Sequence, residues 1–130
     1  MQQIRRVLII DDDEDDRELF CEAVGYVSKD IDCFHATDGE KALEFLTRGH
    51  GNLPDFIFLD LNMPRLNGKE CLAEIKKRNH IKHIPVIIYS TSNSRYDQEE
   101  TRLLGAANFL HKPNEFKLLI EELTSILAWQ

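Results

Sequence analysis

Four largely apolar runs of this sequence each end at side chains that could take part in chemistry. The runs at 7–10, 56–59, 86–89 and 108–111 are followed, in that order, by Asp11, Asp12 and Asp13, by Asp60, by Ser90 and Thr91, and by Lys112. A short apolar run that stops at polar residues is typical of a buried strand that emerges into a loop. Strand C-termini meet at one edge of a parallel α/β sheet, where ligands bind, so we expect these side chains to share one site.

The acids of this expected site predict a divalent cation. Two like charges about 4 Å apart repel by about 4 kcal/mol at an effective dielectric of about 20, so converging carboxylates need a cation or raised pKa values. Mg²⁺ prefers oxygen ligands and shares its remaining positions with water and phosphate oxygens. Asp11, Asp12 and Asp60 would supply the acids, and the main-chain carbonyl of Asn62 would complete the protein ligands. Because Asp13 is also acidic, the metal pair is either Asp11 with Asp12 or Asp12 with Asp13.

The remaining side chains predict phosphoryl transfer to a carboxylate. Lys112 and the Ser90 hydroxyl would compensate the charge on the phosphoryl oxygens. Aspartyl phosphates are an established form of covalent catalysis. Asp60 is the expected acceptor, because it stands alone at the end of the central apolar run.

A simpler explanation covers part of the acidic run Asp11 to Asp16. Carboxylates at a helix N-terminus cap free N–H groups and favour the positive end of the helix dipole. This explains residues 13–16 better than Asp11 and Asp12, which lie at the strand boundary. A calcium loop is excluded, because its sixth position requires glycine.

Apolar periodicity predicts the elements that must position these residues. We expect strands at 4–10, 31–36, 56–60, 86–90 and 108–112, and helices at 14–27, 39–48, after Gly68, at 96–104 and at 115–129. The first helix is expected to bury Leu19, Phe20, Ala23, Val24 and Val27. Alternating strands and helices imply right-handed crossovers and a parallel sheet covered on both faces. The fold class is therefore α/β, a doubly wound five-stranded parallel sheet with five helices.

Length and charge limit the classes of function. A chain of 130 residues is one domain, and its 16 Lys and Arg against 23 Asp and Glu give a net charge of −7. A chain with no basic stripe is poorly suited to phosphate backbones, so we expect no direct nucleic-acid binding. We also expect no membrane span, since no apolar run approaches about 20 residues, and a cytoplasmic location.

The three cysteines predict no special chemistry. Cys21, Cys33 and Cys71 are widely spaced, odd in number and form no CxxC pair. This pattern suggests neither a disulfide framework nor a zinc site. We expect all three to be small core residues.

Five motifs together resemble the receiver domains of two-component response regulators. They are IIDDD at 9–13, DG at 38–39, FLDLNMPRLNG at 58–68, PVIIYS at 85–90 and GAANFLHKP at 105–113. The resemblance covers essentially all 130 residues. It implies a flavodoxin-like fold with strand order 2-1-3-4-5 and a single receiver domain over 1–130, with no effector domain.

The resemblance also implies roles for individual residues. Asp60 would be the phosphoacceptor, and Mg²⁺ would bind Asp11, Asp12, Asp60 and the Asn62 carbonyl. Ser90 would follow the phosphoryl group, and Lys112 would pair with it. Phe109 would be the aromatic that turns on phosphorylation, and the Lys112–Pro113 peptide would be cis.

The partners implied are those of a phosphorylation switch. A sensor histidine kinase would donate the phosphoryl group, and the output would be contact with a downstream target or a phosphotransfer protein. The connections at 48–55 and 76–85 resemble those of stand-alone receivers that partner phytochrome-type kinases. A homodimer through Tyr96 and Leu103 is an alternative to ordinary packing of their helix.

Other classes of protein fit this sequence less well. A small phosphatase or phosphotransferase with an aspartyl nucleophile would need a second acid and a cap, for which 130 residues leave no room. A receiver-like binding module that is never phosphorylated would not need the acids, the hydroxyl and the lysine together. A flavin-binding domain of similar topology would need a Gly-rich loop where this chain is acidic.

Overall fold

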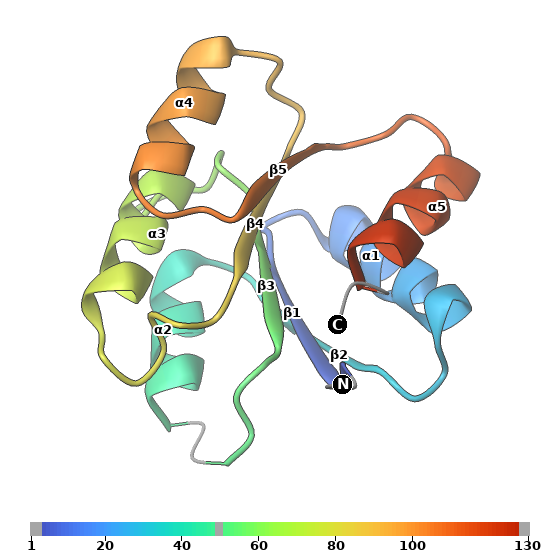
Figure 1. Ribbon diagram of the computed structural model, residues 1–130, viewed down its shortest axis with the longest axis horizontal. Helices are drawn as coiled ribbons and strands as arrows, with labels where there is room; N and C mark the ends of the chain where they lie inside the picture. The colour runs from blue at the N-terminus through green and yellow to red at the C-terminus, as the bar shows by residue number, and fades with distance from the viewer. Residues whose placement is uncertain (1–3, 49–50, 128–130) are drawn as a thin grey trace.

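The centre of the fold is a five-stranded parallel sheet, seen in a computed structural model that describes residues 4–48 and 51–127 (Figure 1). The strands are β1 (Arg6–Ile10), β2 (Asp32–Ala36), β3 (Phe56–Leu59), β4 (Val86–Ser90) and β5 (Asn108–His111). The helices are α1 (Glu14–Val27), α2 (Gly39–Arg48), α3 (Gly68–Lys77), α4 (Arg95–Leu103) and α5 (Phe116–Leu127). Strands and helices alternate along the chain, as the apolar pattern predicts.

The strand order is β2-β1-β3-β4-β5, and all four neighbouring pairs are parallel. Helices α1 and α5 lie on one side of the sheet, and α2, α3 and α4 lie on the other (Figure 1). This is the flavodoxin-like doubly wound fold that the sequence predicts. The order reverses between β1 and β3, so the edge beyond their C-terminal ends is where this fold places ligands.

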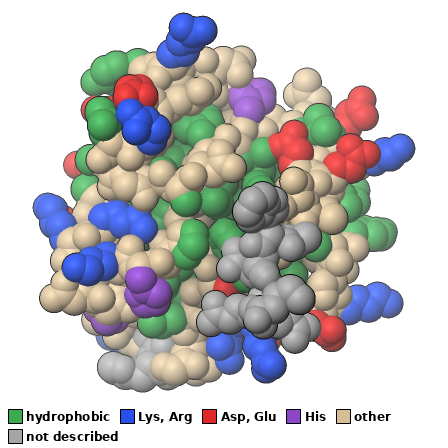
Figure 2. All heavy atoms as spheres, in the orientation of Figure 1, with side chains coloured by type: hydrophobic (Ala, Val, Ile, Leu, Met, Phe, Trp, Pro, Cys, Tyr) green, Lys and Arg blue, Asp and Glu red, His purple; other side chains and the backbone are tan. Residues whose placement is uncertain are grey.

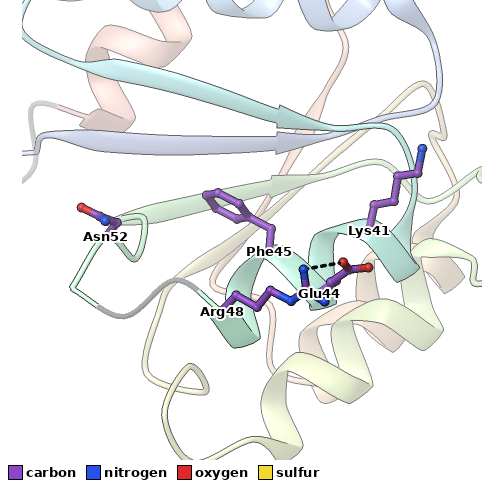
Figure 3. Close-up of a pocket in the computed structure, with 5 residues that line it drawn as sticks. All are labelled: Lys41, Glu44, Phe45, Arg48 and Asn52. Carbon is purple, nitrogen blue, oxygen red and sulfur yellow. Dashed lines mark ion pairs between the residues drawn. The ribbon is translucent and has the colours of Figure 1, made fainter.

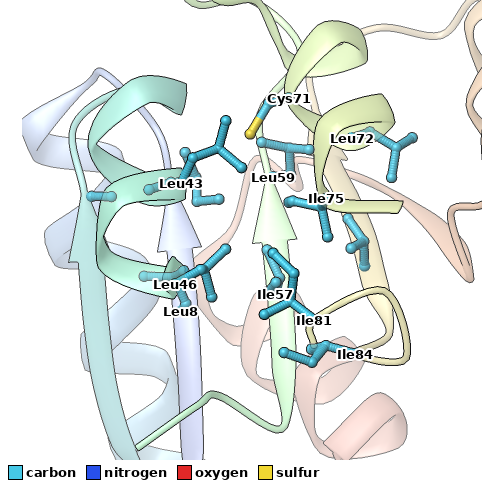
Figure 4. Packing of buried hydrophobic residues seen from close by; sticks show 14 of the residues in the cluster. Leu8, Leu43, Leu46, Ile57, Leu59, Cys71, Leu72, Ile75, Ile81 and Ile84 are labelled. Atoms are coloured by element: carbon cyan, nitrogen blue, oxygen red, sulfur yellow. The ribbon is translucent and has the colours of Figure 1, made fainter. Parts of the chain in front are cut away.

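The two faces of the sheet bury separate apolar clusters. On the side of α2 and α3, Leu46 and Ile75 pack with Ile57 of β3 (Figure 4). On the side of α1 and α5, the rings of Phe20 and Phe58 lie 4.8 Å apart. Successive residues of a strand point to opposite faces, so a strand covered on both sides is continuously apolar. This explains the unbroken apolar runs at 7–10 in β1, 56–59 in β3 and 86–89 in β4.

Side-chain caps begin α1, α3 and α4. Asp13 accepts a hydrogen bond from the N–H of Asp16 at 3.0 Å, and Ser94 caps α4 in the same way. Asn67 and Glu70 form a reciprocal capping box at the start of α3. Such caps pair N–H groups that the helix leaves free. They fix where each helix begins beyond the strand that precedes it.

The element bounds agree with the predicted ones to within one or two residues, with one local error in burial. Leu19 of α1 is 47% exposed, whereas Phe20, Ala23 and Val24 are buried as predicted. One residue along a helix turns the side chain by about 100°, so Leu19 falls outside the buried stripe that Phe20 begins. The predicted end of the last helix, at 128–129, lies outside the described residues.

The prediction for Cys21 and Cys33 is wrong. They form a disulfide that joins α1 to β2, with Cα atoms 5.5 Å apart and a sequence separation of 12. The chain reverses direction between these elements, which brings the two positions together although their spacing matches no motif. Cys71 is a free, buried residue of α3, as predicted.

The surface shows no concentration of basic residues on the face in view, in agreement with the acidic composition of the chain. Lys and Arg side chains are scattered over the face shown in Figure 2 and form no stripe there. Within the described ranges, none of the helices has the length and apolar character to cross a bilayer.

Candidate functional site

Three carboxylates converge where β1 and β3 end. One oxygen from each of Asp11, Asp12 and Asp60 lies within 4.8 Å of the others. Asp11 and Asp60 are buried, and Asp12 is exposed. The Asp60 N–H donates to the carbonyl of Ile10 at 2.9 Å, so the β1–β3 ladder fixes the backbone that carries the two buried acids.

Asp13 has a different task from its two neighbours. Its carboxylate caps α1, and its N–H donates to Asp11 Oδ1 at 2.9 Å. Of the two pairs that the sequence leaves open, Asp11 with Asp12 is therefore the one that lies beside Asp60.

Lys112 extends from the residue after β5 into this acidic cluster. Its Nζ atom lies 2.8 Å from Asp11 Oδ2, 2.8 Å from Asp16 Oδ2 and 3.8 Å from Asp60 Oδ1. It also lies 5.3 Å from the centre of the Tyr89 ring. The structure thus brings one ammonium close to the carboxylates that follow β1 and β3 and to one carboxylate of α1.

Sequence reasoning did not find Asp16 as part of this site. It assigned Asp16 to the start of α1, where the residue does lie. The sequence position of Asp16 could have indicated its role, because Asp16 lies in the first turn of α1, which follows the acidic residues after β1. A carboxylate there faces the same edge of the sheet as Asp11.

Burial and neighbouring charge control the protonation of the site. Burial raises the pKa of Asp60 to about 6, although the Lys112 ammonium acts in the opposite direction. Burial likewise raises the pKa of Asp11. Burial disfavours the charged form of Lys112, yet hydrogen bonds to Asp11 and Asp16 raise its pKa above its usual value. The positive charge of Lys112 therefore does not fully compensate the buried carboxylates. Because the available ligand atoms are all oxygens, the site fits a hard divalent cation.

Ser90 lies on β4, which pairs with β3, and Phe109 lies on β5, which pairs with β4. Leu59 pairs with Ile88 in the parallel ladder, so the end of β4 carries Ser90 close to the level of Asp60. Ser90 is fully buried, and its Oγ accepts a hydrogen bond from the N–H of Ser92 at 3.1 Å. Phe109 is half-buried and packs against the core cluster on the side of α2 and α3.

The loop after Asp60, which contains Asn62, is held at both ends. Asn62 is exposed, and its N–H lowers the pKa of Asp60, against the larger effect of burial. Gly68 ends the loop, and a Cβ atom there would lie 2.3 Å from the Asp60 carbonyl oxygen. Glycine is therefore required for α3 to start this close to the end of β3.

An ion pair on the far side of this loop was also missed by the sequence analysis. The Arg65 guanidinium lies 3.1 Å from the buried carboxylate of Asp38, and Arg65 has a positive φ of 63°. Hydrogen bonding to the N–H of Lys41 lowers the pKa of Asp38, and Arg65 adds to the effect. The ion pair fastens the loop to the N-terminus of α2.

The predicted cis peptide before Pro113 is wrong. No peptide bond among the described residues is cis. In the trans form, the Lys112 N–H donates to the Ser90 carbonyl at 2.7 Å while the ammonium reaches Asp11. The position of Lys112 in the site therefore needs no cis bond, and the trans form is favoured by about 0.5–1 kcal/mol.

A surface pocket larger than the others found among the described residues lies away from this site. It has a volume of about 560 Å³ and lies along α2 and the segment before β3, lined by Lys41, Glu44, Phe45, Arg48 and Asn52 (Figure 3). Arg48 pairs with Glu44 at 3.1 Å in this hollow. Its lining includes none of the clustered acids, so this hollow is separate from the carboxylate site.

Comparison with known proteins decides the family. The model of the response regulator receiver domain matches residues 7–124. The chain belongs to this family. The carboxylates of Asp11, Asp12 and Asp60 form the acidic pocket of the receiver domain, and Lys112 is the lysine of its phosphorylation site.

Three receiver proteins illustrate the similarity. Response regulator Rcp1 from Synechocystis sp. is 31% identical over 124 residues, which cover 92% of this chain and 84% of Rcp1. The crystal structure of its Mn²⁺-bound form has a TM-score of 0.82 at 30% identity, covering 96% of this chain and 93% of that one. The structure of response regulator RPA3017, described in red light signaling of R. palustris, has a TM-score of 0.87 at 28% sequence identity, and the match covers 98% of this chain and 94% of that one. The crystal structure of the phosphorylated cyanobacterial phytochrome response regulator RcpA has a TM-score of 0.84 at 29% sequence identity, and the match covers 95% of this chain and 91% of RcpA.

Membership defines the general activity of the chain. A receiver domain takes part in two-component signalling with a cognate histidine kinase. It is not an enzyme beyond the chemistry of its own phosphorylation.

Proposed function

We propose that Asp60 is the phosphoacceptor of a single-domain response regulator. Its carboxylate is buried at the middle of the sheet edge, within 4.8 Å of the oxygens of Asp11 and Asp12, and 3.8 Å from Lys112. This arrangement is the observation that carries the proposal. Asp60 Oδ attacks the phosphorus of a kinase phosphohistidine, the P–N bond breaks, and the imidazole nitrogen leaves with its electron pair.

The proposed cofactor is Mg²⁺. It would be held by Asp11, Asp12, Asp60 and the main-chain oxygen of Asn62. The donors are all oxygens, and Rcp1 is described in a Mn²⁺-bound form, which supports a site for a hard divalent cation. When bound, the cation supplies positive charge to the phosphoryl oxygens.

Lys112 and Ser90 are proposed to hold the transferred phosphoryl group. The Lys112 ammonium lies close enough to Asp60 to pair with a group that is added there. The Ser90 oxygen already accepts a bond from Ser92, which leaves its own O–H free to donate. Both groups stabilise negative charge that is absent before transfer.

We propose that Ser90 carries the signal toward α4. Ser92 donates its hydroxyl hydrogen to Asp97 of α4 at 2.6 Å, so movement of Ser90 is linked to that helix through the loop after β4. Phe109 lies beside this strand, paired with Ile88, and would turn inward. The result would be two states of the surface made by α4, β5 and α5.

The proposed partners follow from the output surface and from the relatives. The relatives that are described in phytochrome and red light signaling support a phytochrome-type sensor kinase as the donor. The output is contact with a downstream target or a phosphotransfer protein. Tyr96 and Leu103 of α4 are 69% and 71% exposed and would support a homodimer. We propose residues 1–130 as one receiver unit that acts in the cytoplasm.

Phosphorylation by a small-molecule donor tests the assignment of Asp60. With phosphoramidate and Mg²⁺, intact-mass spectrometry should show one phosphate on the wild type and none on Asp60→Asn. Asp30→Asn is the matched control, because Asp30 is an exposed aspartate of a turn and should not affect labelling. Equal labelling of Asp60→Asn and wild type would remove the assignment. Transfer from a phosphorylated phytochrome-type kinase, compared with an unrelated histidine kinase, tests the donor.

A further inference from the structure

The ammonium of Lys112 is divided between two carboxylates, and neither of them is Asp60. Its Nζ atom lies 2.8 Å from Asp11 and 2.8 Å from Asp16, which are hydrogen-bond distances, and 3.8 Å from Asp60, which is not. An ammonium has three protons, so two of them are already used. A phosphoryl group on Asp60 would have to draw Lys112 away from a partner or take its remaining proton.

The two partners of Lys112 are not equivalent. Asp11 is buried, belongs to the three-carboxylate cluster and also accepts the N–H of Asp13. Asp16 lies outside that cluster, and its side chain is 37% exposed. Its one side-chain hydrogen bond within the described chain is to Lys112. Water can replace Lys112 at Asp16 but not at Asp11, so Asp16 is the partner that Lys112 gives up at low cost.

We propose that Asp16 is a positioning residue that holds Lys112 back from Asp60 before phosphorylation and so slows acceptance of the phosphoryl group. This inference rests on the proposed function of Asp60. Asp16 pairs with Lys112 in the unphosphorylated state and loses that contact when Lys112 turns to the phosphoryl oxygens. Breaking the pair beforehand therefore favours the phosphorylated state.

The test compares three variants of the full chain. Asp16→Asn keeps the shape of the side chain and removes the charge that holds Lys112. Asp15→Asn removes the same charge from the adjacent, exposed residue of the same helix turn, which does not contact Lys112. Asp16→Glu retains a carboxylate and should restore wild-type behaviour.

Two measurements separate this role from a general change of charge. The first is the rate constant for phosphorylation by phosphoramidate over a range of donor concentrations. The second is binding of beryllofluoride, which imitates the phosphoryl group, at saturating Mg²⁺. The magnitude of a partly exposed ion pair predicts that Asp16→Asn raises both the rate and the affinity by about two- to fivefold. Asp15→Asn and Asp16→Glu should stay close to wild type, and Mg²⁺ affinity without beryllofluoride should be the same in Asp15→Asn and Asp16→Asn.

The outcomes of this experiment separate failure of the inference from failure of the proposed function. If Asp16→Asn behaves as Asp15→Asn, or reacts more slowly than wild type, the inference is overturned while the function of Asp60 stands. A wild-type protein that neither accepts phosphate nor binds beryllofluoride would instead contradict the proposed function. Circular dichroism of each variant checks that the substitution leaves the fold intact.

Discussion

The Lys112 Nζ atom lies 3.8 Å from Asp60 Oδ1, close enough for an ion pair and too far for a hydrogen bond. Asp60 is only 5% exposed, so burial penalises its charge more than this distant ammonium compensates it. The pKa of Asp60 accordingly rises from 3.8 to about 6. The site is thus built with a deficit of positive charge at Asp60, which a bound cation can supply.

Without metal, the stability of the protein should depend on the protonation of Asp60. The folded carboxyl binds its proton more tightly than the unfolded one, so this contribution is present below about pH 3.8 and is lost as the pH rises through about 6. The loss is about 3 kcal/mol for a shift of this size. Urea unfolding in a chelator from pH 3.5 to 7 should show it in the wild type and not in Asp60→Asn. Parallel pH profiles for the two proteins would contradict the expectation.

Substitutions at Asp12 and Asp13 should distinguish the loss of metal binding from the loss of helix capping. Mg²⁺ at about ten times its dissociation constant should raise the wild-type free energy of unfolding by about 1.4 kcal/mol. Asp12→Asn should abolish this increase, because Asp12 belongs to the three-carboxylate cluster. Asp13→Ala should lose about 0.5–2 kcal/mol of stability through loss of the α1 cap and keep the response to Mg²⁺. In thermal unfolding, loss of the Mg²⁺ response in Asp13→Ala as well as in Asp12→Asn would instead assign the metal pair to Asp12 and Asp13.

Two glycine substitutions should have opposite effects on stability. Gly68→Ala would place a Cβ atom 2.3 Å from the Asp60 carbonyl oxygen and 2.5 Å from the Leu61 Cα, and neither backbone atom can move freely. We expect a loss of about 1–3 kcal/mol together with weaker phosphorylation, because the displaced backbone carries Asp60. Gly25→Ala in α1 meets nothing within 4 Å and should add about 0.5–1 kcal/mol. Denaturant midpoints that move in the same direction for both variants would refute this account.

The Cys21–Cys33 disulfide should contribute to stability. It closes a loop with a sequence separation of 12, and cross-linking a loop of that size contributes about 3 kcal/mol in the chain-entropy model. Dithiothreitol should therefore lower the denaturant midpoint of the wild type and leave that of a Cys21→Ala, Cys33→Ala double variant unchanged. Thiol titration of the unfolded, unreduced protein should count one free thiol, that of Cys71. A count of three would contradict the disulfide.

The elements of this fold follow from local properties that the sequence records directly. Apolar runs of about four residues define the central strands β1, β3 and β4, and the polar residues that end or follow the strands place Asp11, Asp60, Ser90 and Lys112 at one edge of the sheet. The parallel order follows because each strand is separated from the next by a helix long enough to cross over. The acidic pocket was therefore predictable before any coordinate was known.

Contacts between distant side chains depend on helix rotation and side-chain direction, which a pattern of residue types specifies too coarsely. Asp16 reaches Lys112 across 96 positions, and Cys21 meets Cys33 only because α1 packs beside β2. By itself, then, the sequence determined the fold, the family and the acids, hydroxyl and amine of the site, because these depend on local periodicity and motif order. The tertiary structure alone decided which aspartate caps the helix, which ones flank Asp60 and which one restrains the lysine, because those choices depend on distances of a few ångströms.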